Sequence, residues 1–566
     1  MAALRDLDPQ APSDRESLDR AVATLLVVRA SGHLADGQRR YPRWELDNGS
    51  LQRLLARGVG GVILLGGSTA ELRLRTRQLA AWARQPLLLC ADVEEGVGQR
   101  FEGASWLVPP LALARIHATD PTLALALARR YGGCTGREAR QLGLNWVLAP
   151  VCDVNSNPAN PVINVRAWGE DPATAGALAA AFSRGLQAEG VIGCAKHFPG
   201  HGDTTTDSHL DLPVLRHDRR RLEAVELPPF QALIDAGTAA VMTAHLLLPA
   251  LDRDHPATLS RAVLTGLLRE DLGFGGLIVT DALVMEAIAG RYGPAEAAVL
   301  ALEAGADLVL MPGDAEGAID AIVAAVRSGR LSPERLEASL ERRRQALSRC
   351  GEGCGSESEG LGSGESFGAR APLGGLSNGP AAADQALALE LVRRSLEIRG
   401  QGPVSGGPGV NLVRLDNSLS SPYLPAGAPA LALPAAAGLR PCLIDGQGPS
   451  PWSGDDAAPL ALERLGEGPV LLQLFVRGNP FRGSAAGPDP WPAVIRQLQD
   501  AGRLAGLAVY GSPYAWQELR PLLEPSLPAA WSPGQMPLAQ NELLGRLGFG
   551  PDRPGSGGTA VADFTD

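Results

Sequence analysis

The sequence predicts an α/β protein: a (β/α)8 TIM-like barrel, then a Gly/Ser-rich linker, then a smaller α/β domain. Three observations predict this fold. Short apolar runs alternate with helix-like segments over about the first 350 residues, a pattern typical of parallel strands covered by helices. Polar residues stand where these runs end, and the composition changes abruptly near residue 350. The expected boundaries are 1–349 for the barrel, 350–380 for the linker, 381–550 for the second domain and 551–566 for a disordered tail.

Eight apolar, β-rich runs are the predicted barrel strands. Four segments between them are rich in Ala, Leu and Arg with helical spacing: 51–58, 122–142, 173–189 and 295–304. Eight strand–helix units in about 350 residues favour a closed barrel. An open, doubly wound sheet is the alternative, because its strands and helices alternate in the same way. The eight runs are 23–28, 61–65, 86–92, 145–151, 191–195, 239–245, 276–281 and 306–311.

Polar side chains stand where the predicted strands end. In a barrel all of these ends open on one face, and barrel enzymes place their sites on that face. Solvated charges scattered at random would not prefer strand ends. The residues in these places are Asp92, Asp153, Lys196 with His197, His245 and Asp281.

The predicted linker and second domain carry little obvious chemistry. The linker is dominated by Gly and Ser, which is typical of a flexible connection. After it, 382–398 is predicted to be a helix, and the apolar runs 410–415, 470–476 and 504–510 are predicted strands. No histidine occurs after His255, so a histidine-based catalyst must belong to the first domain.

Composition excludes several function classes. The 566 residues include 51 Lys and Arg against 62 Asp and Glu, a net charge of −11, and no basic block suits nucleic acid. Seven scattered cysteines, an odd number, predict a reducing compartment rather than a disulfide framework. A charged N-terminus and the lack of a long uncharged apolar run predict neither a signal peptide nor a membrane span. We therefore expect a cytoplasmic protein.

The stretch 191–213, VIGCAKHFPGHGDTTTDSHLDLP, holds the densest chemistry. Three histidines, three aspartates and a lysine stand within sixteen residues of it. Its Gly and Pro forbid a long helix, so we expect a buried strand that releases polar groups into a loop. His197 and His201 could suggest a metal pair, but Pro199 and Gly200 break the helix such a pair would need. We therefore predict no metal and no cofactor.

The segment 196–209, KHFPGHGDTTTDSH, resembles the signature of family 3 glycoside hydrolases of the β-N-acetylhexosaminidase type. The loop 160–172, NPVINVRAWGEDP, looks like the arginine-bearing loop of that family. The second domain resembles the family's C-terminal α/β domain only weakly. Further similar segments follow in the family's order: VMTAHLLLPALD (241–252), PATLSRAVLTGLLREDLGFGGLIVTDALVM (256–285) and AGADLVLMPGD (304–314).

The resemblance implies a retaining exo-glycosidase that removes terminal β-linked N-acetylglucosamine from cell-wall (muropeptide) or chitin-derived fragments. It implies that Asp281 is the nucleophile that forms a covalent glycosyl-enzyme. It also implies that Asp207 and His209 form the acid/base dyad, in which His209 transfers the proton. The residues that would hold the sugar's hydroxyls and acetamido group are Lys196, His197, Arg166, Asp92 and Arg100.

The residue types suit this chemistry. Retaining cleavage needs one carboxylate below the anomeric carbon and a proton donor at the leaving oxygen. The end of a buried strand holds a carboxylate such as Asp281 rigidly. A histidine such as His209 can donate and then accept the same proton near neutral pH. Asp207, two residues earlier, can orient the imidazole and stabilise its cationic form.

One segment departs from the family's pattern. After the aspartate the family usually has an acidic residue, a glycine pair, and then Arg, Val, Gln and Arg. Here 93–100 reads VEEGVGQR, so Glu95 replaces a glycine and Val97 replaces the first arginine, while Gln99 and Arg100 are kept.

Alternative functions stay open at this point. One is a β-glucosidase of the same family, but such relatives typically have an aromatic residue after the nucleophile, and Ala282 follows Asp281 here. Another is a β-N-acetylglucosaminide phosphorylase, since a histidine, unlike a carboxylate, does not repel phosphate. The non-enzyme alternative is a sugar-binding protein without catalysis, which the presence of Asp207, His209 and Asp281 disfavours.

Overall fold

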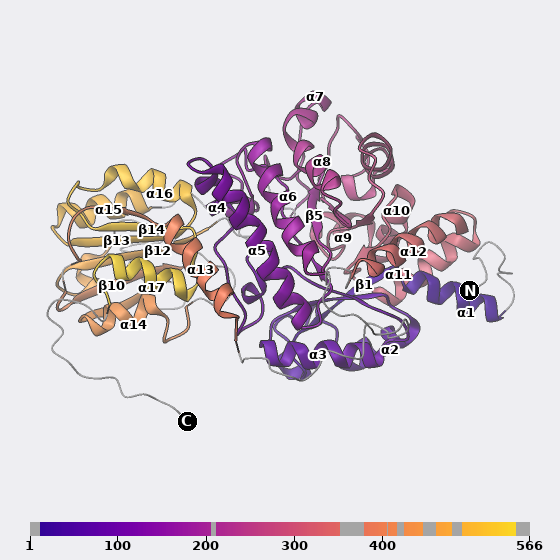
Figure 1. Ribbon diagram of the computed structural model, residues 1–566, viewed down its shortest axis with the longest axis horizontal. Helices are drawn as coiled ribbons and strands as arrows, with labels where there is room; N and C mark the ends of the chain where they lie inside the picture. The colour runs from indigo at the N-terminus through magenta and orange to yellow at the C-terminus, as the bar shows by residue number, and fades with distance from the viewer. Residues whose placement is uncertain are drawn as a thin grey trace, which may run out of the picture. The chain divides into compact units, whose positions relative to one another are not determined.

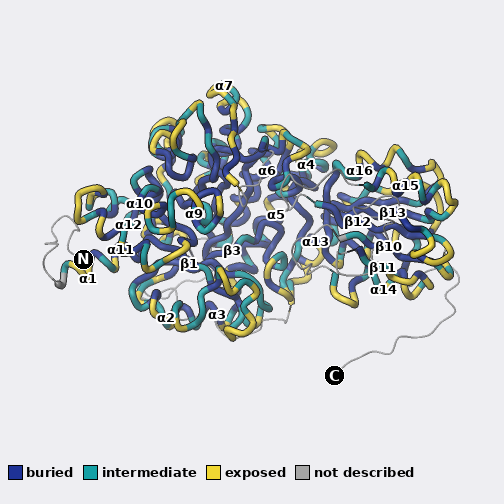
Figure 2. The backbone as a smooth tube through the Cα atoms, turned by 180° about the vertical axis from the view of Figure 1, so that it is seen from behind, coloured by how far each residue is buried: buried dark blue, intermediate teal, exposed yellow. Residues whose placement is uncertain are grey.

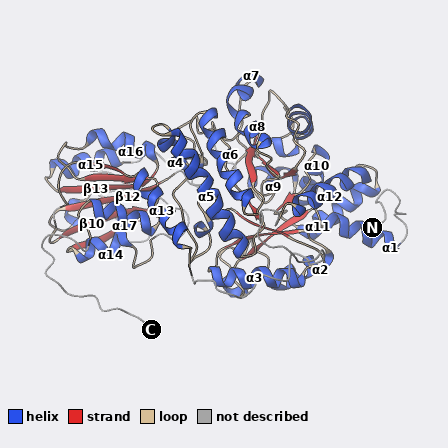
Figure 3. Cartoon of the chain, in the orientation of Figure 1, coloured by secondary structure: helices blue, strands red, loops and turns tan. Residues whose placement is uncertain are grey.

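The computed structural model describes residues 12–204, 211–350, 379–404, 406–415, 424–444, 460–477 and 490–550. Asp207 and His209 lie outside the described residues, as do Cys354, nearly all of the predicted linker and the whole predicted tail. The chain forms two compact units, one holding the described residues up to Leu391 and the other those from Val392 onward. Figure 1 colours both units by residue number, and Figure 3 marks their helices and strands.

The first unit is an eight-stranded parallel barrel. Two sheets of hydrogen-bonded strands, in the orders β4-β3-β2-β1-β8 and β5-β6-β7, make up its wall. Parallel bridges join Trp146 to Ile192 and Val279 to Leu308, so the two sheets close into one ring. The strands are β1 (Leu26–Ser31), β2 (Gly61–Leu65), β3 (Leu88–Ala91), β4 (Trp146–Val147), β5 (Cys194–Phe198), β6 (Ala240–Thr243), β7 (Leu277–Val279) and β8 (Val309–Leu310).

This ring confirms the predicted barrel and excludes the open doubly wound sheet, because an open sheet has no bridge between its two ends. Helices between the strands cover the outside of the ring. The longer helices are α1 (Pro12–Ala23), α2 (Asn48–Arg57), α3 (Thr69–Trp82), α4 (Leu111–His117), α5 (Pro121–Gln141), α6 (Pro172–Ala188), α8 (Pro228–Asp235), α9 (Glu286–Tyr292), α10 (Pro294–Ala304), α11 (Ala315–Arg327) and α12 (Pro333–Ser348). Shorter or wider helical turns are η2 (Asp36–Gln38), η3 (Val97–Gln99), η4 (Asn164–Arg166), α7 (Arg219–Arg221), η5 (Leu222–Glu226), η6 (Ala257–Leu259) and η7 (Ala262–Asp271).

The helix ends follow from local sequence signals. The side chain of Ser68 accepts from the backbone N–H of Glu71, and the Glu71 carboxylate accepts from the backbone N–H of Ser68, so α3 starts with a reciprocal cap. Asp120 and Asp171 cap α5 and α6, and each is followed by a proline at the first helical position, where a missing N–H costs nothing.

The barrel core is apolar and extends into the helix layer. Figure 2 shows the strands of each unit as buried and the outer helix faces as exposed. Trp146 and Trp168 are each at most 1% exposed, so both are core residues rather than exposed platforms for a ligand. Trp168 packs against Tyr131 and Phe182 with ring centroids 5.5 and 5.2 Å apart. These edge and tilted contacts join α5 and α6 to the loop that carries Trp168.

The second unit is a six-stranded sheet in the order β11-β10-β12-β13-β14-β9, with β9 antiparallel at the edge and the other strands parallel. This smaller α/β unit agrees with the prediction. Its strands are β9 (Glu397–Arg399), β10 (Gly409–Leu415), β11 (Leu439–Ile444), β12 (Val470–Val476), β13 (Leu504–Gly511) and β14 (Ala529–Ser532). Its helices are α14 (Pro429–Ala436), η8 (Leu462–Leu465), α15 (Trp491–Asp500), α16 (Pro513–Leu519), η9 (Arg520–Leu522) and α17 (Pro537–Arg546), and α13 (Ala382–Ser395) runs from the first unit into it.

Most element boundaries differ from the prediction by a few residues. β1, β5 and β8 each begin three residues later than predicted, so Lys196 and His197 lie within β5 instead of following it. Polar side chains can occupy this strand because buried partners satisfy them. The predicted helix 382–398 ends at Ser395, and Ile398 belongs to β9.

Two further predictions concern compartment and membrane. Within the described ranges, no helix combines the length and the apolar character that crossing a bilayer requires. Six cysteines lie in those ranges, and all of them are free thiols. The predicted reducing compartment stays a prediction.

Candidate active site

Strand β5 places a lysine inside the barrel. Side chains alternate along a strand, so Cys194 and Lys196 share one face. Lys196 is 2% exposed, and its Nζ lies 2.8 Å from Oδ1 of Asp92 and 2.6 Å from Oε1 of Glu94. Burial alone would lower the pKa of Lys196, but the two carboxylates raise it above the usual value. The ammonium group is therefore charged and paired.

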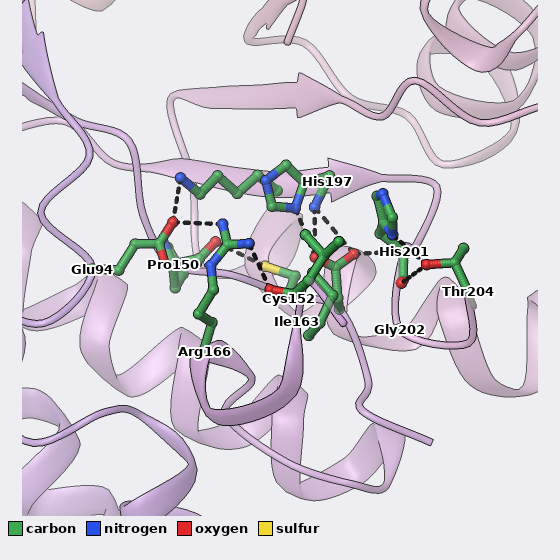
Figure 4. Close-up of polar contacts among 12 residues, drawn as sticks. Glu94, Pro150, Cys152, Ile163, Arg166, His197, His201, Gly202 and Thr204 are labelled. Carbon is green, nitrogen blue, oxygen red and sulfur yellow. Dashed lines mark hydrogen bonds and ion pairs between the residues drawn. The ribbon is translucent and has the colours of Figure 1, made fainter. Parts of the chain in front are cut away.

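Glu94 links this lysine to an arginine from the next loop. Nε and Nη2 of Arg166, at the end of η4, each donate to Glu94 over 2.8 Å, the forked geometry in which arginine binds carboxylates best. Burial alone would raise the pKa of Glu94, but Arg166 and Lys196 hold it well below its usual value. Figure 4 shows the Glu94 and Arg166 side chains facing each other.

The charges of this cluster balance. Asp92 and Glu94 contribute two negative charges, and Lys196 and Arg166 contribute two positive charges. A balanced cluster has no net attraction for a strongly charged ligand, yet it offers N–H donors and carboxylate acceptors. It therefore suits a neutral molecule with many hydroxyl and amide groups.

A second buried group orients His197. Nδ1 of His197 lies 2.7 Å from Oδ2 of Asp153, a carboxylate with no exposed surface. Asp153 also accepts the backbone N–H groups of His197 and His201. This network places the proton on Nδ1 of His197 and fixes the plane of its ring, so its Nε2 is the atom that can accept a hydrogen bond.

His201 continues the network toward residue 204. Its Nδ1 lies 2.7 Å from Oγ1 of Thr204, the last described residue before the segment that carries Asp207 and His209. Burial lowers the pKa of His201 to about 4, so this ring is neutral at pH 7. In Figure 4 His201 and Thr204 lie on the side of His197 away from Glu94.

Asn160 joins the two loops that hold these groups. Its Nδ2 donates to the carbonyl oxygens of His201 and Gly202 over 2.8 and 2.9 Å. Its Oδ1 accepts the backbone N–H groups of Val162 and Ile163, both over 2.8 Å. One buried amide thus ties the start of the arginine-bearing loop to the backbone that follows β5.

Asp281 is fixed just beyond the end of β7. Its backbone N–H donates to Oγ1 of Thr243, and its Oδ1 accepts the backbone N–H of Ala282 over 2.7 Å. Thr243 in turn bonds Thr258, which bonds His245. Three buried side chains from the end of β6 and the following loop therefore support the backbone on which this carboxylate sits.

Charged groups at several strand ends act on the thiol of Cys194. Burial is the main cause of its raised pKa; Asp92 and Asp281 raise the pKa further, and Lys196 lowers it. β3 and β7 each stand one strand away from β5, beyond β4 and β6, so their carboxyl ends open on the same face of the barrel as that of β5.

The structure brings together four of the eight predicted site residues. Asp92, Arg166 and Lys196 meet around Glu94, and His197 follows Lys196 along β5. Arg100 is exposed, and its Nε donates to the backbone carbonyl of Asp92, so it braces the loop that carries Asp92. Asp207 and His209 lie outside the described residues. Their roles, and those of the other predicted residues, stay predictions.

Three supporting residues were not among those predicted: Glu94, Asp153 and Asn160. Glu94 stands at the acidic position of the family's pattern, which could have identified it. Asp153 stood among the strand-end carboxylates, but sequence alone does not pair it with a histidine 44 residues away. Asn160 gave no signal beyond the loop motif that contains it.

In the segment 93–100, which departs from the family's sequence pattern, the two substituted residues make local contacts. Glu95 is 1% exposed, and its Oε2 accepts the indole N–H of Trp106 over 3.0 Å. Val97 is fully buried in the core. The replacements thus serve packing, and Asp92 keeps its contact with Lys196.

One group of described residues outside the site has side chains that could bind a metal. Cys134, Glu138 and Asp384 lie close enough together to hold an ion. Glu138 already accepts hydrogen bonds from Ser105, and Asp384 pairs with Arg137 over 2.7 Å. Burial raises the pKa of both Cys134 and Glu138. These partners account for the cluster without a metal, and it is not part of the site described above.

Comparisons with known proteins show the family to which the chain is similar. Residues 17–345 match the family described as "Glycosyl hydrolase family 3 N terminal domain", and residues 405–548 match "Bacterial Glycosyl hydrolase family 3 C-terminal domain". The solved structure of a glycoside hydrolase family 3 beta-N-acetylglucosaminidase from Paenibacillus sp. str. FPU-7 superimposes with a TM-score of 0.73 and 29% identity, over 94% of this chain and 96% of that one.

Two curated relatives each match about half of this chain. Beta-hexosaminidase A of Pseudoalteromonas piscicida is 38% identical over 285 residues, which are 46% of this chain and 47% of that protein. The beta-N-acetylglucosaminidase/beta-glucosidase of Cellulomonas fimi is 34% identical over 300 residues, which are 51% of this chain and 52% of that protein. The chain spans about half the length of these relatives.

Proposed function

Because this chain belongs to glycosyl hydrolase family 3, we propose that it is a retaining exo-glycosidase that releases terminal β-linked N-acetylglucosamine. The observation that carries the proposal is the charge-balanced cluster of Asp92, Glu94, Lys196 and Arg166, on the barrel face where the carboxylate of Asp281 is fixed just after β7. The cluster suits a neutral sugar, and the carboxylate suits attack on its anomeric carbon.

The first step forms a covalent intermediate. A carboxylate oxygen of Asp281 attacks the anomeric carbon, and the bond from that carbon to the leaving oxygen breaks. His209 gives its proton to the leaving oxygen, with Asp207 stabilising the imidazole. The leaving alcohol departs, and the sugar stays as an ester on Asp281.

The second step returns the enzyme to its starting state. His209, now neutral, takes a proton from water while the water oxygen attacks the same anomeric carbon. The ester bond to Asp281 breaks, and its electron pair returns to the carboxylate. Two inversions give net retention of configuration.

Sugar recognition is assigned to the groups around Glu94. Lys196 and Arg166 donate to hydroxyl oxygens, Asp92 accepts from a hydroxyl, and Nε2 of His197 accepts from a hydroxyl or from the acetamido N–H. Glu94 holds the two cations in place. This division rests on the contacts of these side chains with one another and on the resemblance stated above.

The test compares two aryl substrates that differ only at carbon 2 of the sugar. We expect turnover of the aryl β-N-acetylglucosaminide with retained configuration, measured by proton NMR of the first product, and little turnover of the aryl β-glucoside. The name of the Cellulomonas fimi relative includes both activities, so this pair discriminates. Equal turnover of both substrates would reject the acetamido assignment.

Two variants test the mechanism. Asp281→Asn should lose at least about 10³-fold in kcat, and His209→Ala at least about 10²-fold. Asp235→Asn, an exposed aspartate at the end of α8, and His117→Ala, at the end of α4, are matched controls that should keep wild-type rates. Full activity in Asp281→Asn would overturn the mechanism, and inactivity of the wild type on both sugars would favour a binding protein without catalysis.

Adding phosphate to the assay with the aryl N-acetylglucosaminide tests for phosphorolysis. The product would be the sugar 1-phosphate instead of the free sugar if phosphate, and not water, attacks the intermediate. We propose water as the acceptor, because the balanced cluster offers a dianion no net attraction.

The proposal extends to natural substrates and compartment. We place the protein in the cytoplasm, acting on cell-wall or chitin-derived fragments; the free thiols of the described residues support a reducing compartment. Cell fractionation with an antibody checks the location. Comparing rates on a muropeptide and on a chitin disaccharide checks the substrate.

A further inference from the structure

β1 carries an arginine, Arg29, that contacts two aromatic rings. Within β1, Arg29 is the residue that is not fully buried. The guanidinium carbon of Arg29 lies 5.3 Å from the ring centre of Tyr41 and 5.9 Å from that of Trp44. These distances are in the range of cation–π contact. The two rings are half-buried, 6.0 Å apart, and inclined by 34°.

The register of β1 places these rings at the mouth of the barrel. Ala30 pairs with Leu64 of β2 on one side and forms a parallel bridge with Leu46 on the other. β8 pairs with β1 only at Leu26 and Val27, so the segment 41–46 takes the place beside β1 that β8 leaves. The neighbour of β8 is β7, after which Asp281 stands. The loop that carries the two rings therefore meets β1 at Leu46, on the side where β8 and then β7 follow.

The loop that carries the rings is firmly built. The backbone N–H of Tyr41 donates to Oε2 of Glu45 over 2.9 Å, and Nη1 of Arg39 donates to the carbonyl of Glu45 over the same distance. The Glu45 side chain has no exposed surface. A buried carboxylate that ties the loop to itself holds the ring faces in place before any ligand binds.

The charges of Asp92 and Arg100 act on Arg29, the arginine that contacts Tyr41 and Trp44. Burial lowers the pKa of Arg29; Glu45 and Asp92 raise it, and Arg100 lowers it. The Arg29 guanidinium is thus within the field of the Asp92 loop. Its Nε is buried without a hydrogen-bond partner among the described residues, so the rings and Glu45 account for its position.

We propose that Tyr41 and Trp44 form the surface that binds the sugar ring of the leaving group. This rests on the proposed function, in which the reacting sugar sits against Asp92, Lys196 and Arg166. The leaving group must then extend from Asp281 toward the rim. Aromatic faces offer rigid, partly apolar contact to the C–H face of a sugar ring, and their ordering costs little because only two side-chain torsions are fixed.

The experiment compares a leaving group that has a ring with one that has none. N,N′-diacetylchitobiose releases a sugar, whereas N-acetyl-β-glucosaminyl fluoride releases only fluoride. Trp44→Ala and Tyr41→Ala should each lower kcat/KM for the disaccharide about tenfold and change kcat/KM for the fluoride less than about twofold. Trp44→Phe should keep most of the activity on the disaccharide. Inhibition by free N-acetylglucosamine should be unchanged.

Trp82→Ala is the matched control, because Trp82 on α3 is also half-buried and contacts an arginine, Arg75, at 5.7 Å. It should leave both rates unchanged. An equal loss on both substrates in Trp44→Ala and Tyr41→Ala would overturn the inference while leaving the proposed function intact. A wild type that cleaves neither substrate would overturn the proposed function and the inference with it.

Discussion

Oε1 of Glu94 lies 2.6 Å from Nζ of Lys196, and the same carboxylate accepts hydrogen bonds from Nε and Nη2 of Arg166. Side-chain exposure is only 5% for Glu94 and 2% for Lys196. A buried cation needs a partner, so Glu94 is what allows two of them to stand side by side at the strand ends. Loss of this one carboxylate would leave two like charges adjacent in a poorly solvated place.

Glu94→Gln should therefore weaken both folding and substrate binding. We expect a loss of about 3 kcal/mol in the free energy of unfolding and at least about a tenfold rise in KM, because Lys196 and Arg166 then repel each other. Urea unfolding and steady-state kinetics on the aryl N-acetylglucosaminide measure these effects. Glu189→Gln is the control: Glu189 pairs with Arg137 over 2.7 Å where both side chains are partly exposed, so it should cost less than about 1 kcal/mol and leave KM unchanged. An unchanged KM in Glu94→Gln would contradict the assigned role.

Asn160 is expected to matter for turnover as well as for stability. Asn160→Asp keeps the acceptor for Val162 and Ile163 but loses the donor to His201 and Gly202, so it should lower kcat about tenfold or more. Asn160→Ala leaves buried carbonyl and N–H groups unpaired and should also cost about 2 kcal/mol of stability. Steady-state kinetics and urea unfolding measure both effects.

Asn145→Ala is the matched control for Asn160. Asn145 is also a buried bridging amide, which donates to the carbonyl of Leu87 and accepts from the N–H of Leu89, but it stands at the other end of the strands, before β4. It should lose similar stability and keep kcat. If Asn160→Ala and Asn145→Ala changed kcat equally, the role of Asn160 would be structural only.

The buried ring of His201 should make the free energy of unfolding depend on pH. Its pKa in the folded state is about 4, below the ordinary value of 6.5, so the unfolded chain binds a proton first as the pH falls. Stability from this group is thus fully present above about pH 6.5, falls between about pH 6.5 and 4, and levels off below. We expect wild type to lose about 2 kcal/mol more than His201→Gln between pH 7 and pH 5, measured by urea unfolding. Parallel pH profiles for the two proteins would show that the ring is not buried as described.

The sequence reveals much of the fold because the strands are continuous apolar runs. β2 (Gly61–Leu65) and β12 (Val470–Val476) have the predicted bounds. β5 was misplaced because Lys196 and His197 read as the polar end of a strand, while their burial depends on Asp92, Glu94 and Asp153 from other loops. β9 was missed because three half-exposed or exposed residues after a helix carry no strand pattern.

The same limit applies to the site. Strand-end position alone identified Asp92, Asp153, Lys196, His197 and Asp281 as candidates, since a parallel barrel gathers those ends on one face. Which side chains pair there depends on distances between loops that are far apart in the sequence. The balance of charges around Glu94, and the bridge through Asn160, follow only from the folded chain.

Asp307 should be a stability residue with no part in catalysis. It is fully buried just before β8, accepts the backbone N–H of Ile278 on β7 over 2.9 Å, and pairs with Arg269. Arg335 and Arg342 of α12 also reach it, at 3.2 and 3.0 Å. One carboxylate thus joins β7, η7 and α12 at the N-terminal face of the strands, away from the face that holds Asp281.

Asp307→Asn should lower the free energy of unfolding by about 4 kcal/mol, because three guanidinium groups would remain around a neutral amide. The folded fraction should keep wild-type kcat and KM, since the site lies at the other ends of the strands. Asp19→Asn, which breaks a partly exposed pair with Arg57 at 2.6 Å, should cost less than about 1 kcal/mol. Urea unfolding of the three proteins, with kinetics at low urea, separates these results. A stable Asp307→Asn protein with reduced kcat would contradict the assignment, because it would mean that the carboxylate acts on the site and not on closure of the barrel between β7 and β8.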